Sequence, residues 1–128
     1  MWIKYNANPV ANRVEDCIIR AVAVALDISW DDAFDLVAEN AKQMGNVMHS
    51  NVVYGSVLRQ HGFNRYIIPN SCPDCYTVKD FCRDHPKGVY VLGADSHVVA
   101  SIDGDYIDTF DSGEEPIFYY WKEINDGI

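Results

Sequence analysis

Positive charge is scarce in this chain of 128 residues. Ten lysines and arginines stand against nineteen aspartates and glutamates, which gives a formal net charge of −9. The basic residues are scattered singly and form no stripe. Nucleic acids and anionic membrane surfaces are bound mainly through clustered Lys and Arg, so this composition argues against both partners. We therefore expect no nucleic acid and no membrane among the partners.

Long apolar runs are also lacking. No run approaches the ~18 residues of a transmembrane helix, and the segment Met1–Asn6 does not have the charged and then apolar layout of a secretory signal. We therefore expect a cytoplasmic protein. Thiols stay reduced in that compartment, so we expect the four cysteines to be free, catalytic or metal-binding rather than bridged.

Internal repeats, low-complexity stretches and linkers are absent as well. Hydrophobic residues make up 48% of the chain and aromatic residues 12%, so long disordered stretches are not expected. A chain of this length can bury one hydrophobic core without disulfides or metals. We therefore expect residues 1–128 to form a single domain.

Hydrophobic residues recur at helical spacing through the first two thirds of the chain, between capping residues and glycines. Residues 1–15 are polar and Asn-rich, and we expect a loop there. Residues 17–26 are almost wholly apolar and would also suit a strand, but their alanines and the capping residue Asp16 favour a buried helix. The predicted helices cover residues 17–26, 29–44, 51–61 and 77–84.

After Gly88 the hydrophobic period changes to two, which is typical of strands. Residues 103–105, Asp-Gly-Asp, are a strong hairpin signal between two of these strands. The predicted strands cover residues 63–68, 89–92, 97–102, 106–110 and 117–121. Helices first and strands afterwards predict an α+β domain, in which N-terminal helices pack on a C-terminal antiparallel sheet.

Cys17 lies at the predicted start of the first helix. Backbone N–H groups and the helix dipole favour a thiolate over a thiol at that position. A free cysteine is more often a buried structural residue, so Cys17 alone is better explained by packing. A second observation is His97, which begins an apolar strand eighty residues later. Cysteine and histidine together are the elements of nucleophilic catalysis.

The hairpin predicts a third member of this group. With a two-residue turn at 103–104, the alternation of side chains puts His97 and Asp108 on the same face, diagonally related. A three-residue turn would place Asp111 opposite His97 instead. Asp108 is therefore the first candidate to orient the imidazole, and Asp111 is the alternative. Cys17, His97 and Asp108 are then a candidate nucleophile, base and orienter.

Three short motifs carry a resemblance to a known family: Asp16-Cys17-x-x-Arg20-Ala21, Gly88-Val89-Tyr90-Val91-Leu92 before His97-Val98-Val99-Ala100, and Asp103-Gly104-x-x-x-Asp108. In this order they resemble the papain-like cysteine peptidase fold, in particular the compact bacterial and bacteriophage types related to bacteriocin-leader peptidases. The resemblance covers most of the chain, from about Cys17 to Phe110. It implies a cysteine hydrolase, a peptidase or amidase that acts on a peptide or protein substrate without a cofactor. Its nucleophile would be Cys17, its general base and acid His97, and its orienter Asp108.

The family also expects a side-chain donor to the oxyanion, usually a glutamine six residues before the cysteine. This chain has Ala11 at that position. We assign the role to Asn12, five residues before Cys17, with Asn6 and Asn8 of the same segment as alternatives. The backbone N–H of Cys17 would supply the other donor.

A competing group of residues lies outside this pattern. Cys72, Cys75, Cys82 and His85 are the residue types of a tetrahedral zinc site. The spacing from Cys75 to Cys82 is short, however, and Cys82 falls where a core residue of the fourth helix belongs. A labile disulfide between Cys72 and Cys75, or no special role, are the other interpretations. The alternatives to a hydrolase are thus a catalytically silent papain-like binding or inhibitory module and a zinc-stabilised interaction domain.

Overall fold

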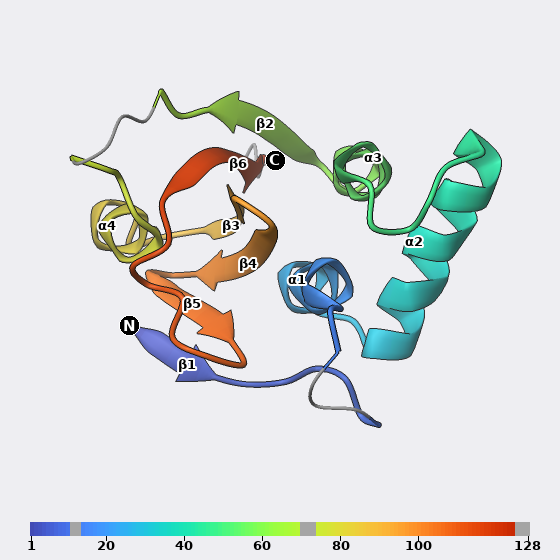
Figure 1. Ribbon diagram of the computed structural model, residues 1–128, viewed down its shortest axis with the longest axis horizontal. Helices are drawn as coiled ribbons and strands as arrows, with labels where there is room; N and C mark the ends of the chain where they lie inside the picture. Colours follow the sequence, from blue (N-terminus) through green and yellow to red (C-terminus); the bar gives the residue numbers. More distant parts are fainter. Residues whose placement is uncertain (11–13, 70–73, 125–128) are drawn as a thin grey trace.

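The computed structural model describes residues 1–10, 14–69 and 74–124 (Figure 1). These residues form a mixed α/β arrangement of four helices and one six-stranded sheet, in agreement with the predicted α+β class. The helices are α1 (Cys17–Leu26), α2 (Trp30–Met44), α3 (Asn51–Gln60) and α4 (Val78–Asp84). The strands are β1 (Trp2–Lys4), β2 (Phe63–Ile67), β3 (Val89–Ala94), β4 (His97–Ile102), β5 (Asp105–Asp108) and β6 (Ile117–Glu123).

The helices agree with the predicted ranges to within one residue at each end, because the sequence carries their caps. At the start of α2 the Ser29 hydroxyl accepts from the Asp32 N–H, and Gly45 ends the helix in the left-handed conformation at φ 62°. At the start of α4 Thr77 and Asp80 form a complete capping box. Residues 17–26 are helical rather than extended, as predicted.

The sheet has the strand order β1-β5-β4-β3-β6-β2. β1 runs parallel to β5, and all other neighbours in the sheet are antiparallel. The prediction of a loop over residues 1–15 is therefore wrong for Trp2–Lys4, and the sheet is mixed rather than purely antiparallel. Three residues are too few to show a period, and this strand gains its hydrogen bonds from a partner at the other end of the sequence.

The helices cover both faces of the sheet (Figure 1). On one face α1 packs against β3 and β4, and α2 and α3 pack around α1. α4 covers the opposite face, where its apolar side chains pack in a second cluster with strand residues that include Leu92, Val99 and Tyr106. α1 therefore lies at the centre of the molecule, between the sheet and α2, which explains why its sequence is almost entirely apolar. No helix in residues 1–10, 14–69 and 74–124 is long and apolar enough to cross a bilayer.

The hairpin between β4 and β5 has the predicted register. Ile102 pairs with Asp105, and Ala100 pairs with Ile107, which leaves a two-residue turn at 103–104. Both turn residues have positive φ, 49° for Asp103 and 85° for Gly104, as a type I′ turn requires. This register brings the start of β4 next to the end of β5, where two of the candidate site residues lie.

Candidate active site

Cys17 is the first residue of α1, and its side chain is partly buried. Asp16 stands at the N-cap position, but the expectation that its side chain caps the helix is wrong: it makes no capping hydrogen bond. The Asp16 carboxylate pairs instead with Arg20, one helical turn further on. The carboxylate therefore does not occupy the first-turn N–H groups of α1.

His97 and Asp108 meet at the end of the hairpin. The Nε2 of His97 lies 2.6 Å from Oδ2 of Asp108, and both side chains are almost fully buried. The alternative carboxylate, Asp111, accepts a hydrogen bond from the Tyr106 hydroxyl at 2.5 Å and another from the Gly113 N–H. Of the two aspartates considered from the sequence, Asp108 is thus the one that contacts the imidazole.

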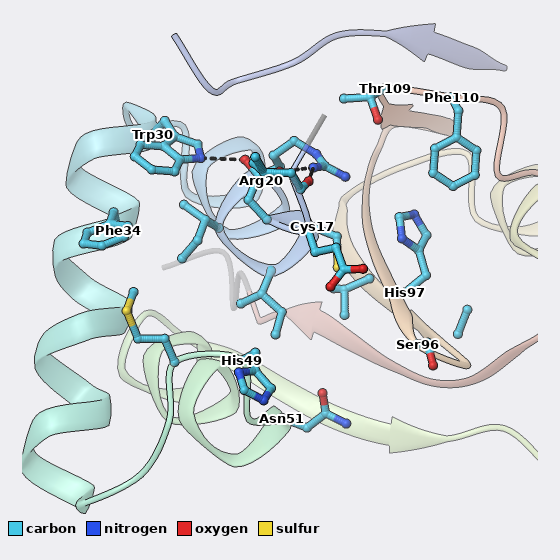
Figure 2. A pocket seen from close by; sticks show the side chains of 18 of the residues that line it. Cys17, Arg20, Trp30, Phe34, His49, Asn51, Ser96, His97, Thr109 and Phe110 are labelled. Carbon is cyan, nitrogen blue, oxygen red and sulfur yellow. Dashed lines mark hydrogen bonds and ion pairs between the residues drawn. The ribbon is translucent and has the colours of Figure 1, made fainter. Parts of the chain in front are cut away.

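The thiol of Cys17 lies next to the same imidazole (Figure 2). Burial raises the pKa of Cys17, but hydrogen bonds to its sulfur from the His97 ring and the Val98 backbone outweigh this effect and bring the pKa below its usual value. Burial lowers the pKa of His97, whereas its hydrogen bonds with Asp108 and Cys17 raise it, to about 9. Both changes favour a thiolate–imidazolium pair at neutral pH.

Asp108 is held by a shell of donors. Its carboxylate accepts from the Ser112 hydroxyl at 2.7 Å and from the Thr109 N–H at 2.8 Å. Its backbone oxygen accepts from the Trp2 indole at 3.2 Å and from the Tyr5 N–H at 3.0 Å. β1, the strand that the sequence did not reveal, therefore fixes the strand end that carries Asp108. These donors hold the carboxylate in one orientation toward the imidazole.

Cys17 and His97 line a cleft of about 940 Å³. Figure 2 shows Trp30 and Phe34 projecting from α2 on one side of Cys17, with Thr109 and Phe110 on the side of His97. The Phe110 ring lies against His97 at 5.0 Å between ring centroids. The other residues that line the cleft are Val14, Glu15, Asp16, Ile18, Ile19, Arg20, Met48, His49, Asn51, Ala94, Ser96, Val98 and Tyr119.

The side-chain donor expected for the oxyanion stays a prediction. Asn12 lies outside the described residues. The Asn8 amide donates to Oδ2 of Asp16 at 3.1 Å, and Asn6 accepts from the Asn8 N–H at 3.0 Å. Asn6 and Asn8 are not among the described residues that line the cleft. The N–H of Cys17, the other expected donor, belongs to the first residue of α1, where the helix itself provides no acceptor for it.

The remaining cysteines do not behave alike. Cys17 and Cys82 are free, but Cys75 is disulfide-bonded, so the expectation of unbridged cysteines is wrong for Cys75. Cys72, the other half of the predicted pair, lies outside the described residues. A bridged Cys75 is not available as a zinc ligand, because metal binding requires the thiolate.

The other two members of the proposed zinc group have partners within the fold. The sulfur of Cys82 lies 3.4 Å from the Ser101 hydroxyl oxygen, in the cluster under α4. The Nδ1 of His85 lies 2.8 Å from the Phe81 carbonyl oxygen, and the two rings stack at 3.8 Å. Within the described parts of the chain no three His, Cys, Asp or Glu side chains are arranged to hold a metal ion. Cys75, Cys82 and His85 therefore do not form a zinc site in the described part of the chain.

Three residues of the site were not assigned a role from the sequence. Arg20 pairs with Asp16 and reaches Oδ1 of Asp108 at 3.7 Å. Trp30 donates its indole N–H to Asp16 at 2.9 Å, and Ser112 donates to Asp108. Of these three, Arg20 could have been found from the sequence, because it is the one charged residue in an otherwise apolar helix and follows Asp16 by four positions.

Comparisons with protein-family models, with curated proteins and with solved structures find no match to this chain.

Proposed function

We propose that this protein is a cysteine hydrolase of the papain-like type, a peptidase or amidase that uses Cys17, His97 and Asp108 on a peptide or amide bond. The observation that carries the proposal is the continuous contact from the Cys17 thiol through the His97 ring to the Asp108 carboxylate. A thiol at a helix start, an imidazole beside it and a buried carboxylate behind it are the three parts that cysteine-mediated acyl transfer requires.

The two ring nitrogens of His97 have separate roles. Nε2 is held by Asp108, which leaves Nδ1 for the thiol. The Cys17 thiolate attacks the carbonyl carbon, and the Cys17 N–H stabilises the oxyanion that forms. His97 gives the Nδ1 proton to the departing amine, and a thioester remains on Cys17. His97 then takes a proton from water, the hydroxide attacks the thioester, and the acid product leaves as the thiol regains its proton.

The cleft supports a peptide as the substrate. It is open, and on its apolar wall on α2 the rings of Trp30 and Phe34 contact each other in a tilted arrangement, 5.3 Å between ring centroids. Phe34 is 39% exposed, so its ring is accessible at the surface of this wall. An apolar side chain of the substrate fits against this wall while its amide bond lies over Cys17. No cofactor takes part in the proposed reaction.

Alkylation of the thiol provides the first test. We expect iodoacetamide to modify Cys17 at pH 6 to 7 faster than an ordinary free thiol, and we expect His97→Ala to slow the reaction. Cys82 is the internal control, because it is buried and its pKa is raised by burial. Labelling of each cysteine is followed by peptide mass spectrometry. A Cys17 that reacts no faster than a free thiol would refute the proposal and leave the silent binding module as the better explanation.

Hydrolysis provides the second test. The protein is incubated with a peptide library in water enriched in oxygen-18, and new carboxyl termini are identified by mass spectrometry. We expect cleavage that Cys17→Ala abolishes and Cys82→Ala leaves unchanged. We also expect the cleavage rate to fall as the pH rises through about 9, because His97 then loses the proton that the leaving amine needs. Cleavage that persists in Cys17→Ala would show that another group is the nucleophile.

A further inference from the structure

Arg20 occupies an unusual place for a charged side chain. It lies on the central helix α1, and its side chain is only 13% exposed. A buried guanidinium is costly unless anions compensate it. Two carboxylates do so: Asp16 from the start of the same helix and Asp108 from the end of β5. Arg20 therefore bridges the element that carries Cys17 to the residue that orients His97.

We propose that Arg20 is a positioning residue of this site, which ties the Asp108 carboxylate to the N-terminal turn of α1 and so aligns the His97 ring with the Cys17 thiol. The inference rests on the proposed function. One guanidinium nitrogen of Arg20 pairs with Oδ1 of Asp16, and the other lies 3.7 Å from Oδ1 of Asp108. The planar fork of arginine can serve two carboxylates in fixed directions, which a lysine ammonium cannot do equally well.

Asp16 is built to hold Arg20 and not to cap the helix. Its second oxygen, Oδ2, accepts from the Trp30 indole at 2.9 Å and from the Asn8 amide at 3.1 Å. Its carboxylate makes no capping hydrogen bond to α1, although it stands at the cap position. Because two donors hold Oδ2, the orientation of the Asp16 carboxylate is fixed. In this orientation Oδ1 faces Arg20.

The five groups form a row of alternating charge when the catalytic pair is ionised. In order of contact they are Asp16, Arg20, Asp108, His97 and Cys17. Each charge in this row has an opposite charge as its neighbour. Loss of Arg20 would leave the carboxylates of Asp16 and Asp108 facing one another without the cation between them. Asp108 would then be held less firmly, and the His97 ring that it contacts would lose its fixed orientation.

The test compares Arg20→Gln, Arg20→Lys and the wild-type protein by the pH dependence of Cys17 alkylation and by the rate of peptide cleavage. In Arg20→Gln we expect the alkylation rate to rise only at higher pH than in the wild type. We expect cleavage to slow by about 10- to 100-fold, because a misplacement of about 1 Å has effects of this size. In Arg20→Lys we expect the alkylation profile to recover, since the charge is kept, while cleavage stays slow.

A matched control is Arg83→Gln. Arg83 also pairs with two carboxylates, Asp80 and Asp84, but it is exposed on α4, on the opposite face of the sheet. We expect this variant to match the wild type in both assays. Circular dichroism and thermal unfolding establish that each variant is folded. If Arg20→Gln does not fold, the variant Trp30→Phe tests the inference instead. It removes the indole donor to Asp16 and keeps an aromatic ring. We expect the pH profile of Cys17 alkylation in this variant to shift to higher pH, as in Arg20→Gln.

Three outcomes overturn the inference. One is an alkylation profile and cleavage rate of folded Arg20→Gln that equal those of the wild type. Another is full recovery of cleavage in Arg20→Lys, which would show that charge alone suffices. The third, where Arg20→Gln is unfolded, is a wild-type profile in Trp30→Phe. These results differ from failure of the proposed function, in which the wild-type Cys17 itself shows no enhanced reactivity.

Discussion

Replacement of Asp108 by asparagine tests how the carboxylate supports the thiolate. Asparagine has the same shape, but one oxygen becomes an NH₂ group. In the wild type Oδ2 of Asp108 accepts from His97 at 2.6 Å and Oδ1 accepts from the Thr109 N–H at 2.8 Å. If the amide oxygen stays with Thr109, the NH₂ group faces Nε2 of His97, and two donors cannot pair. The ring then keeps Nε2 as an acceptor, and its proton moves to Nδ1.

The pKa of His97 gives the scale of the effect. Burial lowers this pKa, but hydrogen bonds with Asp108 and Cys17 outweigh burial and raise it to about 9 from its ordinary value of 6.5. At about 1.36 kcal/mol per pH unit, the net difference corresponds to about 3 kcal/mol in favour of the imidazolium. Because burial opposes them, the two hydrogen bonds together contribute more than this net amount. We therefore expect the ratio of ion pair to neutral pair to fall by roughly 100-fold in Asp108→Asn.

The assay is alkylation of Cys17 by iodoacetamide at pH 6, where an ordinary thiol is protonated and reacts slowly. We expect Asp108→Asn to react far more slowly than the wild type at pH 6 and to approach it only at alkaline pH. The control is Asp111→Asn, which changes a neighbouring carboxylate that bonds Tyr106 and does not contact His97; we expect no change. A folded Asp108→Asn protein with undiminished reactivity at pH 6 would refute the reasoning.

Two further predictions concern packing and capping. A Cβ at Gly93 would lie 2.0 Å from the Tyr119 ring, and that ring cannot move easily because its hydroxyl lies 2.5 Å from the hydroxyl of Tyr54. Gly93→Ala should therefore lower the free energy of unfolding, measured in urea, by about 1–3 kcal/mol or more. An unchanged midpoint of the urea transition would contradict this contact. Thr77→Ala removes the capping box of α4 and should cost about 1 kcal/mol without changing Cys17 alkylation, because α4 covers the other face of the sheet. A slower alkylation in Thr77→Ala would show that the two faces are coupled.

The sequence was a reliable guide where the determining forces are local. Ser29, Gly45 and Thr77 are caps that act on their own helix turns, so the helix ends could be predicted closely. The turn at 103–104 determines the register of its hairpin, so the proximity of His97 to Asp108 could be inferred before any tertiary contact was known.

The same local rules failed where a residue had a stronger partner far away in the sequence. Asp16 has the type and position of a capping residue, yet it pairs with Arg20 and accepts from Trp30. Trp2–Lys4 shows no strand period but is extended because it pairs with β5. In both cases a contact made only in the folded chain outweighs a modest local preference.

The sequence by itself therefore determined the elements, their ends and the hairpin that joins His97 to Asp108, because propensity, capping and turn geometry act over a few residues. Only the tertiary structure decided that the Cys17 thiol lies beside His97, eighty positions away, and that Arg20 joins Asp16 to Asp108. The packing of α1 against β3 and β4 makes these contacts, and such packing depends on the shape of the whole core. The buried charges of the site can be read only after that core is known.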